Sequence, residues 1–167
     1  IRNKMTIKPK TLLFADEFPP AGGGAGTIAL RTFQDLIALD NNLTLLTGNE
    51  TEERNECKHI RVKRITIFWV LTYTIAIYKK LNLNIFTNII LNDVIAGYIA
   101  GICFSKKQLA KTTYVVHGSE GNLFFNNKSF KAKIFCHNLV YSRLLKNCRK
   151  VVCVSNNGLE RFLQATP

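Results

Sequence analysis

The sequence predicts an α/β protein built on one doubly wound, mostly parallel, Rossmann-like sheet with helices on both faces. Short apolar or β-branched runs alternate with longer segments of helical period, six times along the chain. Parallel strands need crossover connections, and these place helices on both faces of the sheet. The chain has 167 residues, 47% of them hydrophobic, which is enough to bury a core without disulfides.

The expected strands are short and rich in apolar residues: 12–15, 43–47, 60–63, 85–91, 114–116 and 150–154. The expected helices follow an apolar period of three and four: from residue 26 onward, 66–81, 94–103, 132–144 and 157–164. Residues 48–58 are polar and acidic, which favours an exposed loop. In the helix over 94–103, Gly97 and Gly101 would permit close packing against a neighbour.

The net charge of +12 points to an anionic partner, such as nucleic acid, a membrane surface or a phosphorylated substrate. A charged surface that only keeps the protein soluble remains the alternative. The apolar content excludes a disordered chain, and the few Gly and Pro exclude a linker. The basic residues form small groups: Arg61, Lys63 and Arg64; Lys79 and Lys80; Lys106, Lys107 and Lys111; Arg149 and Lys150.

The five cysteines have no C-x-x-C spacing, which is typical of a reduced, cytosolic protein without structural zinc. We expect residues 1–10 to be an N-terminal extension; it is basic and lacks the apolar core of a signal peptide. Residues 1–4 precede the single methionine, Met5, and need not be native. The longest apolar run, 65–78, is too short to span a bilayer.

The segment 66–81 is apolar nearly all round and has basic residues at both ends. A buried core helix is the favoured interpretation. The alternative is an interfacial helix on an anionic membrane, with Phe68, Trp69, Tyr73 and Tyr78 at the depth of the headgroups.

Ligands of open parallel sheets bind beyond the carboxyl ends of the strands. Polar and glycine residues follow four of the expected strands, so we expect them to meet at one edge. They are Asp16 with the loop 17–26, Asn92 with Asp93, the run His117, Gly118, Ser119, Glu120 and Gly121, and the run 155–157.

The glycine loop after the first strand contains Gly22, Gly23 and Gly24. Glycines let backbone N–H groups approach a phosphate, and the following helix adds its positive end. No Gly-Lys-Ser/Thr follows, so the loop is not a P-loop. Gly24-x-Gly26-x-x-Ala29 matches a dinucleotide fingerprint, but it opens too far after the strand. A loop without a ligand is the remaining alternative.

His117 is the most informative single residue, because it ends a strand and Glu120 lies within reach in the same loop. His59 and His137 are interpreted as structural. The histidines have no zinc-like spacing, and no G-x-S-x-G motif is present to hold a nucleophilic serine. Asn157, with Glu160 three residues later, resembles a capping box, which accounts for the polar residues at 155–157.

Four segments together, in this order and spacing, resemble the N-terminal domain of family 4 glycosyltransferases. They are 18–24 (FPPAGGG), 43–47 (LTLLT), 115–120 (VVHGSE) and 151–155 (VVCVS). The resemblance implies one half of a GT-B enzyme, in which two Rossmann-like domains enclose the active site. It also implies transfer of a sugar with retention of configuration and without a bound metal.

Site residues are implied in the same way. Gly23 and Gly24 would lie against the donor diphosphate and the acceptor, and His117 against the transferred sugar. Glu120 would support the loop of His117, and these two would be the catalytic residues. Asp93 would line the acceptor side, whereas Asn92 stands where many members have His. Gly22, Asp16, Gly118 and Ser119 complete the expected substrate-binding set.

The resemblance further implies that residues 11–167 form the acceptor-side domain and that the donor-binding domain is absent from this chain. The donor would be a UDP- or GDP-sugar, with no tightly bound cofactor. The acceptor would be a polysaccharide or lipid-linked glycan of the cell envelope. We expect a cytoplasmic protein, with peripheral attachment to the inner membrane face.

Two other functions remain open. A basic α/β module for nucleic acid or another polyanion would explain the charge, but no helix-turn-helix, zinc finger or RNP-type strand accompanies it. A complete dinucleotide-binding domain would explain the fold but not the charge.

Overall fold

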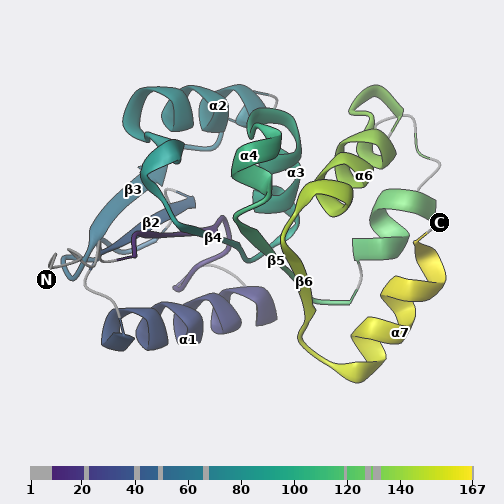
Figure 1. The fold of residues 1–167 in the computed structure, drawn as a ribbon, viewed down its shortest axis with the longest axis horizontal. Helices are drawn as coiled ribbons and strands as arrows, with labels where there is room; N and C mark the ends of the chain where they lie inside the picture. The colour runs from purple at the N-terminus through teal and green to yellow at the C-terminus, as the bar shows by residue number, and fades with distance from the viewer. Residues whose placement is uncertain are drawn as a thin grey trace, which may run out of the picture.

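The computed structural model contains one six-stranded, all-parallel sheet in the order β3-β2-β1-β4-β5-β6 (Figure 1), which confirms the predicted fold class. It describes residues 9–20, 23–39, 42–48, 51–65, 68–118, 120–126, 129 and 133–166. The strands are β1 (Thr11–Ala15), β2 (Leu43–Gly48), β3 (Lys58–Val62), β4 (Asn88–Leu91), β5 (Thr112–Val116) and β6 (Lys150–Cys153).

Helices cover both faces of the sheet. In Figure 1, α1 lies below the strands, and α2, α3 and α6 lie above them. The helices are α1 (Gly24–Leu39), α2 (Trp69–Lys80), α3 (Val94–Cys103), α4 (Lys106–Leu109), α6 (His137–Asn147) and α7 (Asn156–Ala165). Two irregular turns are the 3-10 helix η1 (Leu83–Ile85) and the π-helical turn η2 (Asn122–Asn126).

The central strand β1 is buried along its whole length and divides the core in two. Leu12 and Phe14 face the cluster formed with α2, α3 and α6. Leu13 and Ala15 face the smaller cluster formed with α1. This alternation follows from the two-residue period of a strand, and burial on both faces explains why the segment is a continuous apolar run.

Some element boundaries differ from those expected, and one helix was not expected at all. Strand β4 begins at Asn88 rather than at residue 85, because Asn82 caps η1: its side chain accepts a hydrogen bond from the Asn84 nitrogen at 3.1 Å. Helix α4 was not expected; a capping box between Ser105 and Gln108 starts it. Helix α7 begins at Asn156, so its N-cap is Ser155 and not Asn157.

The helix expected over 132–144 is also shorter than the periodicity suggested. Helix α6 begins at His137 because Cys136 takes a left-handed conformation, with φ 48°. The periodicity placed Leu139 and Leu144 on the buried face; Leu144 is buried as expected, but Leu139 is 71% exposed, and Tyr141 is buried as well. Residue 132 lies outside the described residues.

The loop before β3 is not wholly exposed. Thr51 is buried, and its hydroxyl lies 2.8 Å from that of Thr47. His59 joins the same group: its Nδ1 accepts a hydrogen bond from the Arg54 nitrogen, and its Nε2 donates one to Thr47. Burial lowers the pKa of His59, so this histidine is a neutral structural residue.

Helix α2 buries one face and exposes the other. Tyr73, Ala76 and Ile77 are buried, so Tyr73 is not available at an interface, contrary to the second interpretation of this segment. Phe68 and Tyr78 are exposed as that interpretation requires. None of the helices in the described part of the chain is long and apolar enough to cross a membrane.

Gly97 and Gly101 of α3 make the close contacts that the sequence predicted. A Cβ atom on Gly97 would lie 2.7 Å from the ring of Tyr114. A Cβ atom on Gly101 would lie 2.6 Å from Val140 of α6. The missing side chains therefore let α3 approach both β5 and α6.

Candidate functional site

The carboxyl ends of β1 and β4 meet at the point where the strand order reverses. From β1 the chain runs through α1 to β2, and from β4 it runs through α3 to β5, so the two connections leave toward opposite faces. The Asn92 nitrogen donates to the Phe14 oxygen at 2.9 Å, which fixes the two strand ends side by side. Such a switch point is where open α/β sheets bind ligands, with helix N-termini at its rim.

Asp16, directly after β1, has a fully buried side chain. One carboxylate oxygen accepts a hydrogen bond from the Arg64 guanidinium at 2.9 Å, and the other accepts one from the Tyr73 hydroxyl. Burial, and then the nearby Asp16 charge, raise the pKa of Tyr73 far above its usual value. Both oxygens of Asp16 thus have partners that tie β1 to α2 and to the segment after β3.

Asp93 caps helix α3 and is only 3% exposed. Its Oδ1 accepts a hydrogen bond from the Ala96 nitrogen at 2.8 Å, and its Oδ2 accepts one from the Glu17 nitrogen at 3.2 Å. Burial raises the pKa of Asp93 to about 7, the Ala96 hydrogen bond works against this, and the Asp16 charge adds to it. Asp93 therefore holds the start of α3 beside the end of β1.

Asn92 is completely buried and only partly bonded. Its amide nitrogen donates to the Ala25 oxygen at 2.8 Å, in the first turn of α1. Its Oδ1 is buried and has no hydrogen-bond partner among the described residues. A buried acceptor without a donor costs free energy, so this oxygen marks a place where a donor would be favourable.

His117 follows β5 and turns toward β4. Its Nε2 lies at hydrogen-bond distance from the Asn92 backbone oxygen. Because a carbonyl only accepts, Nε2 must carry the proton, which leaves Nδ1 as the acceptor in the neutral ring. The ring is half-buried.

Glu120 stabilises this loop by binding its backbone. Its two carboxylate oxygens accept hydrogen bonds from the backbone nitrogens of His117 and Gly118, each at 2.7 Å. The residue is 1% exposed. Since both oxygens are used in this way, Glu120 is placed to position His117 rather than to touch a ligand.

Gly118 is required by the backbone. Its φ of +113° is a conformation that only glycine adopts readily, and a Cβ would lie 3.1 Å from Gly158 Cα in α7. Ser155 caps that helix by accepting a hydrogen bond from the Gly158 nitrogen at 3.0 Å. Ser155 therefore has a structural role at the start of α7, which the sequence analysis had given to Asn157 with Glu160.

The glycine loop is different, because no contact with another described residue requires glycine at Gly23 or Gly24. Gly23 and Gly24 are exposed, and a Cβ on either would have nothing within 4 Å. Phe18 anchors the loop; it is buried and packs edge-on against Phe33 of α1, with ring centroids 5.7 Å apart. Open space at the start of a helix leaves room for a ligand to approach the backbone.

The structure thus gathers Asp16, Asn92, Asp93 and His117 at one sheet edge, next to Gly23 and Gly24. Gly22 and Ser119, also expected there, lie outside the described residues. Sequence reasoning missed Tyr73 and Arg64, the partners of Asp16. No local pattern could have identified them, since both come from distant segments.

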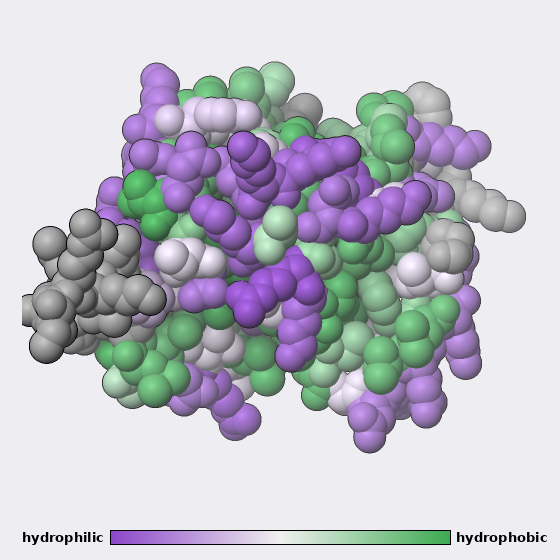
Figure 2. All heavy atoms as spheres, viewed as in Figure 1, coloured by the Kyte–Doolittle hydropathy of each residue, from purple (hydrophilic) through white to green (hydrophobic). Residues whose placement is uncertain are grey.

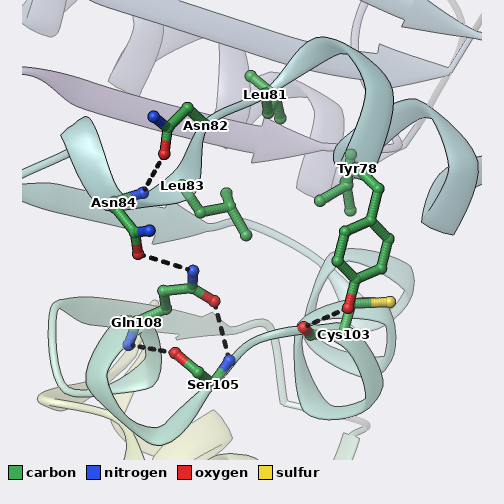
Figure 3. Close-up of a pocket in the computed structure, with 9 residues that line it drawn as sticks. Tyr78, Leu81, Asn82, Leu83, Asn84, Cys103, Ser105 and Gln108 are labelled. Carbon is green, nitrogen blue, oxygen red and sulfur yellow. Dashed lines mark hydrogen bonds between the residues drawn. The ribbon is translucent and has the colours of Figure 1, made fainter.

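One pocket lies at the opposite edge of the sheet, between α2, η1, α3 and α4, with a volume of about 490 Å³ (Figure 3). Its polar side chains bond mostly to one another or to nearby backbone. Gln108 donates to Asn84 at 3.2 Å and accepts from the Ser105 nitrogen at 2.8 Å. These bonds join the turns before β4 and β5, so the pocket carries no functional assignment.

Within the described residues, no group of three or more His, Cys, Asp and Glu side chains is placed to hold a metal ion. Comparison of the chain with protein-family models gives no match, and comparison with curated proteins gives none. Fold and site together define a Rossmann-like α/β protein with a polar switch-point edge.

Proposed function

We propose that this chain is the acceptor-side N-terminal domain of a retaining glycosyltransferase. The enzyme would transfer a sugar from a UDP- or GDP-sugar to a polysaccharide or lipid-linked acceptor. The observation that carries the proposal is the meeting of the glycine loop, Asn92 and His117 at one sheet edge. Two of the four segments that resemble family 4 glycosyltransferases supply Gly23, Gly24 and His117.

Each group has a chemical use in such an enzyme. The exposed backbone at Gly24, with the positive end of α1, suits a diphosphate. The Gly23 nitrogen already donates to the Glu17 carboxylate at 3.4 Å, so a diphosphate would displace that side chain. His117 Nδ1 can accept a hydrogen bond from a sugar hydroxyl, because the Asn92 carbonyl holds the proton on Nε2. The unpartnered Asn92 Oδ1 would accept from a second hydroxyl or a bridging water. Glu120 is the positioning residue for His117.

The donor-binding half of the enzyme would hold the nucleotide base, so this domain should contact only the sugar and diphosphate. Saturation-transfer NMR with a UDP- or GDP-sugar tests this directly. We expect transfer to the sugar protons and little to the base protons. His117→Ala and Gly24→Ala should abolish the signal, while Leu39→Ala, an exposed change on the far end of α1, should leave it unchanged.

A second candidate is a dinucleotide-binding domain. The strand order 3-2-1-4-5-6 is that of NAD-binding domains, and Gly26 and Ala29 of the partial fingerprint are buried in α1. The same NMR experiment separates the two. Strong transfer to the adenine protons of NAD would overturn the glycosyltransferase proposal, as would signals confined to the base of a nucleotide sugar.

The proposal includes a cytoplasmic location at a membrane, where a lipid-linked acceptor would be found. Nucleic acid ranks below a sugar donor, because the observations at the sheet edge concern a small ligand and only the net charge favours a polynucleotide. A gel shift that persists at high salt would reverse that order.

A further inference from the structure

The outer face of α2 and its approach is a stripe of large apolar side chains. Phe68, Leu71, Ile75 and Tyr78 are 59%, 53%, 43% and 69% exposed. Their spacing of three, four and three residues puts them on one side of the helix. Figure 2 shows apolar side chains along the upper rim of the molecule, over α2, with hydrophilic ones beside them. Single exposed apolar residues are ordinary, whereas a contiguous patch marks a contact surface.

This stripe, which we call the α2 face, is not the buried side of a core helix. The opposite side of α2 already packs on the sheet through Tyr73, Ala76 and Ile77. The α2 face is therefore an additional apolar surface, and the part of the chain that the structure describes does not cover it.

The surroundings of the α2 face are positively charged. Residues 57–92 contain no Asp or Glu and the six basic residues Lys58, Arg61, Lys63, Arg64, Lys79 and Lys80. Lys79 and Lys80 lie exposed in the last turn of α2, and the Lys58 ammonium lies 3.4 Å from the Lys80 oxygen. At the other end, Lys63 is exposed and Arg64 is half-exposed while it bonds to Asp16. Positive charge thus stands at both ends of the stripe.

We propose that the α2 face docks on an anionic phospholipid bilayer, with α2 lying along the membrane surface. An apolar stripe with lysines beside it is the pattern of helices that rest at the headgroup boundary. Two of the six basic residues are paired, Arg61 with Glu53 and Arg64 with Asp16, so the argument from charge depends on the four lysines. Their charge, with no acidic residue in 57–92, favours a uniformly anionic surface over a protein partner, whose charges are mixed. Tyr78 can contribute its exposed ring, while its hydroxyl donates to the Cys103 oxygen at 3.4 Å (Figure 3).

Docking would leave the sheet edge accessible. Tyr73, on the inner side of α2, hydrogen-bonds Asp16 at the end of β1, so one helix separates the bilayer from the candidate site. This inference stands on the α2 face alone and does not depend on the glycosyltransferase proposal.

Trp69 makes the proposal directly measurable. It is the single tryptophan of the chain, lies in the first turn of α2, and is partly buried against Tyr98, with ring centroids 5.6 Å apart. We expect the protein to sediment with vesicles of phosphatidylcholine and phosphatidylglycerol in equal parts, with a blue shift of Trp69 emission. We expect neither effect with pure phosphatidylcholine, and release at high salt.

Paired variants show whether vesicle binding depends on the α2 face itself or on exposed apolar residues and positive charge anywhere on the surface. Leu71→Gln with Ile75→Gln should weaken vesicle binding roughly tenfold or more, whereas Leu159→Gln with Leu163→Gln, equally exposed on α7, should not. Lys79→Glu with Lys80→Glu should weaken it by a similar factor, whereas Arg31→Glu with Arg161→Glu, the same charge change elsewhere, should have a small effect.

Equal losses in the control pairs would overturn the proposal, as would no binding to anionic vesicles. So would a dimer in solution that Leu71→Gln with Ile75→Gln separates, since a second copy would then cover the α2 face. Circular dichroism of each variant shows whether it is folded, and only folded variants enter the comparison.

Discussion

The carboxylate of Glu120 holds the backbone of His117: its Oε1 lies 2.7 Å from the His117 nitrogen, and its Oε2 is equally close to that of Gly118. Glu120→Gln replaces one acceptor by an NH2 group that faces an N–H donor. We expect the free energy of unfolding to fall by about 2 kcal/mol, the usual worth of a hydrogen bond to a buried charge. Urea denaturation measures this, with Glu160→Gln, exposed on α7, as the control. Equal stability of the two variants would contradict the role given to Glu120.

The hydroxyl of Tyr73 should stabilise the buried Asp16. Tyr73→Phe removes one of its hydrogen bonds and leaves the ring in place, so we expect a loss of about 1–3 kcal/mol. Tyr78→Phe removes the same atom from a residue that is 69% exposed, and it should change stability little. Thermal or urea unfolding of the two variants gives the comparison. A loss no larger for Tyr73→Phe would show that the Tyr73 hydroxyl is not needed to stabilise Asp16.

Asp93 makes the stability depend on pH. Burial raises its pKa from 3.8 to about 7, so the folded protein holds this proton more tightly than the unfolded chain does. Between these values the folded state binds more protons, and stability falls as pH rises. We expect the contribution of Asp93 to be full below pH 4 and lost by about pH 7, a change on the order of a few kcal/mol.

Asp93→Asn tests this prediction through the slope of the free energy of unfolding against pH. The variant keeps an oxygen to cap α3 but has no proton to release, so its free energy of unfolding should fall less between pH 4 and pH 7. Asp35→Asn, exposed on α1, should retain the slope of the unaltered protein. An unchanged slope in Asp93→Asn would mean that another group causes the pH dependence.

The contact between α3 and α6 should not tolerate a methyl group at Gly101. Its Cβ would meet the Val140 oxygen at 2.8 Å as well as the side chain, and a backbone atom cannot easily move aside. We expect Gly101→Ala to lower stability by about 1–3 kcal/mol. Gly24→Ala has open space and should be neutral or stabilise α1 by up to about 1 kcal/mol. Denaturation curves of both variants measure these changes in stability. If Gly101→Ala did not lower stability, α6 would be able to shift away from the added methyl group.

The fold followed from periodicity, and the errors have local causes. Strands β1 and β2 were predicted closely because both faces are buried and the apolar run is continuous. The start of β4 was wrong because Ile85 is as apolar as a strand residue, yet Asn82 caps a turn there. The buried face of α6 was only partly predicted: Leu144 is buried as expected, but Leu139 is exposed, and periodicity assumes that every apolar side chain is buried.

The site was only half predictable. Topology alone puts Asp16, Asn92 and His117 at one edge, so the order of strands was sufficient to gather them. The sequence does not show that Glu120 faces two backbone nitrogens or that Tyr73 bonds to Asp16. Those contacts depend on how the loops and α2 pack against the sheet, over separations of up to 57 residues.

The strand order also predicts which part of the sheet unfolds most easily. Strands β1 and β2 are fully buried and paired on both sides, whereas β6 is an edge strand that pairs only with β5 and has partly exposed residues. Amide protons of β1 and β2 should therefore exchange with solvent slowest, and those of β6 much sooner. Gly118 packs on Gly158 of α7. Local unfolding of β6 together with α7 would therefore remove this contact and free the loop of His117, while the other five strands remain paired.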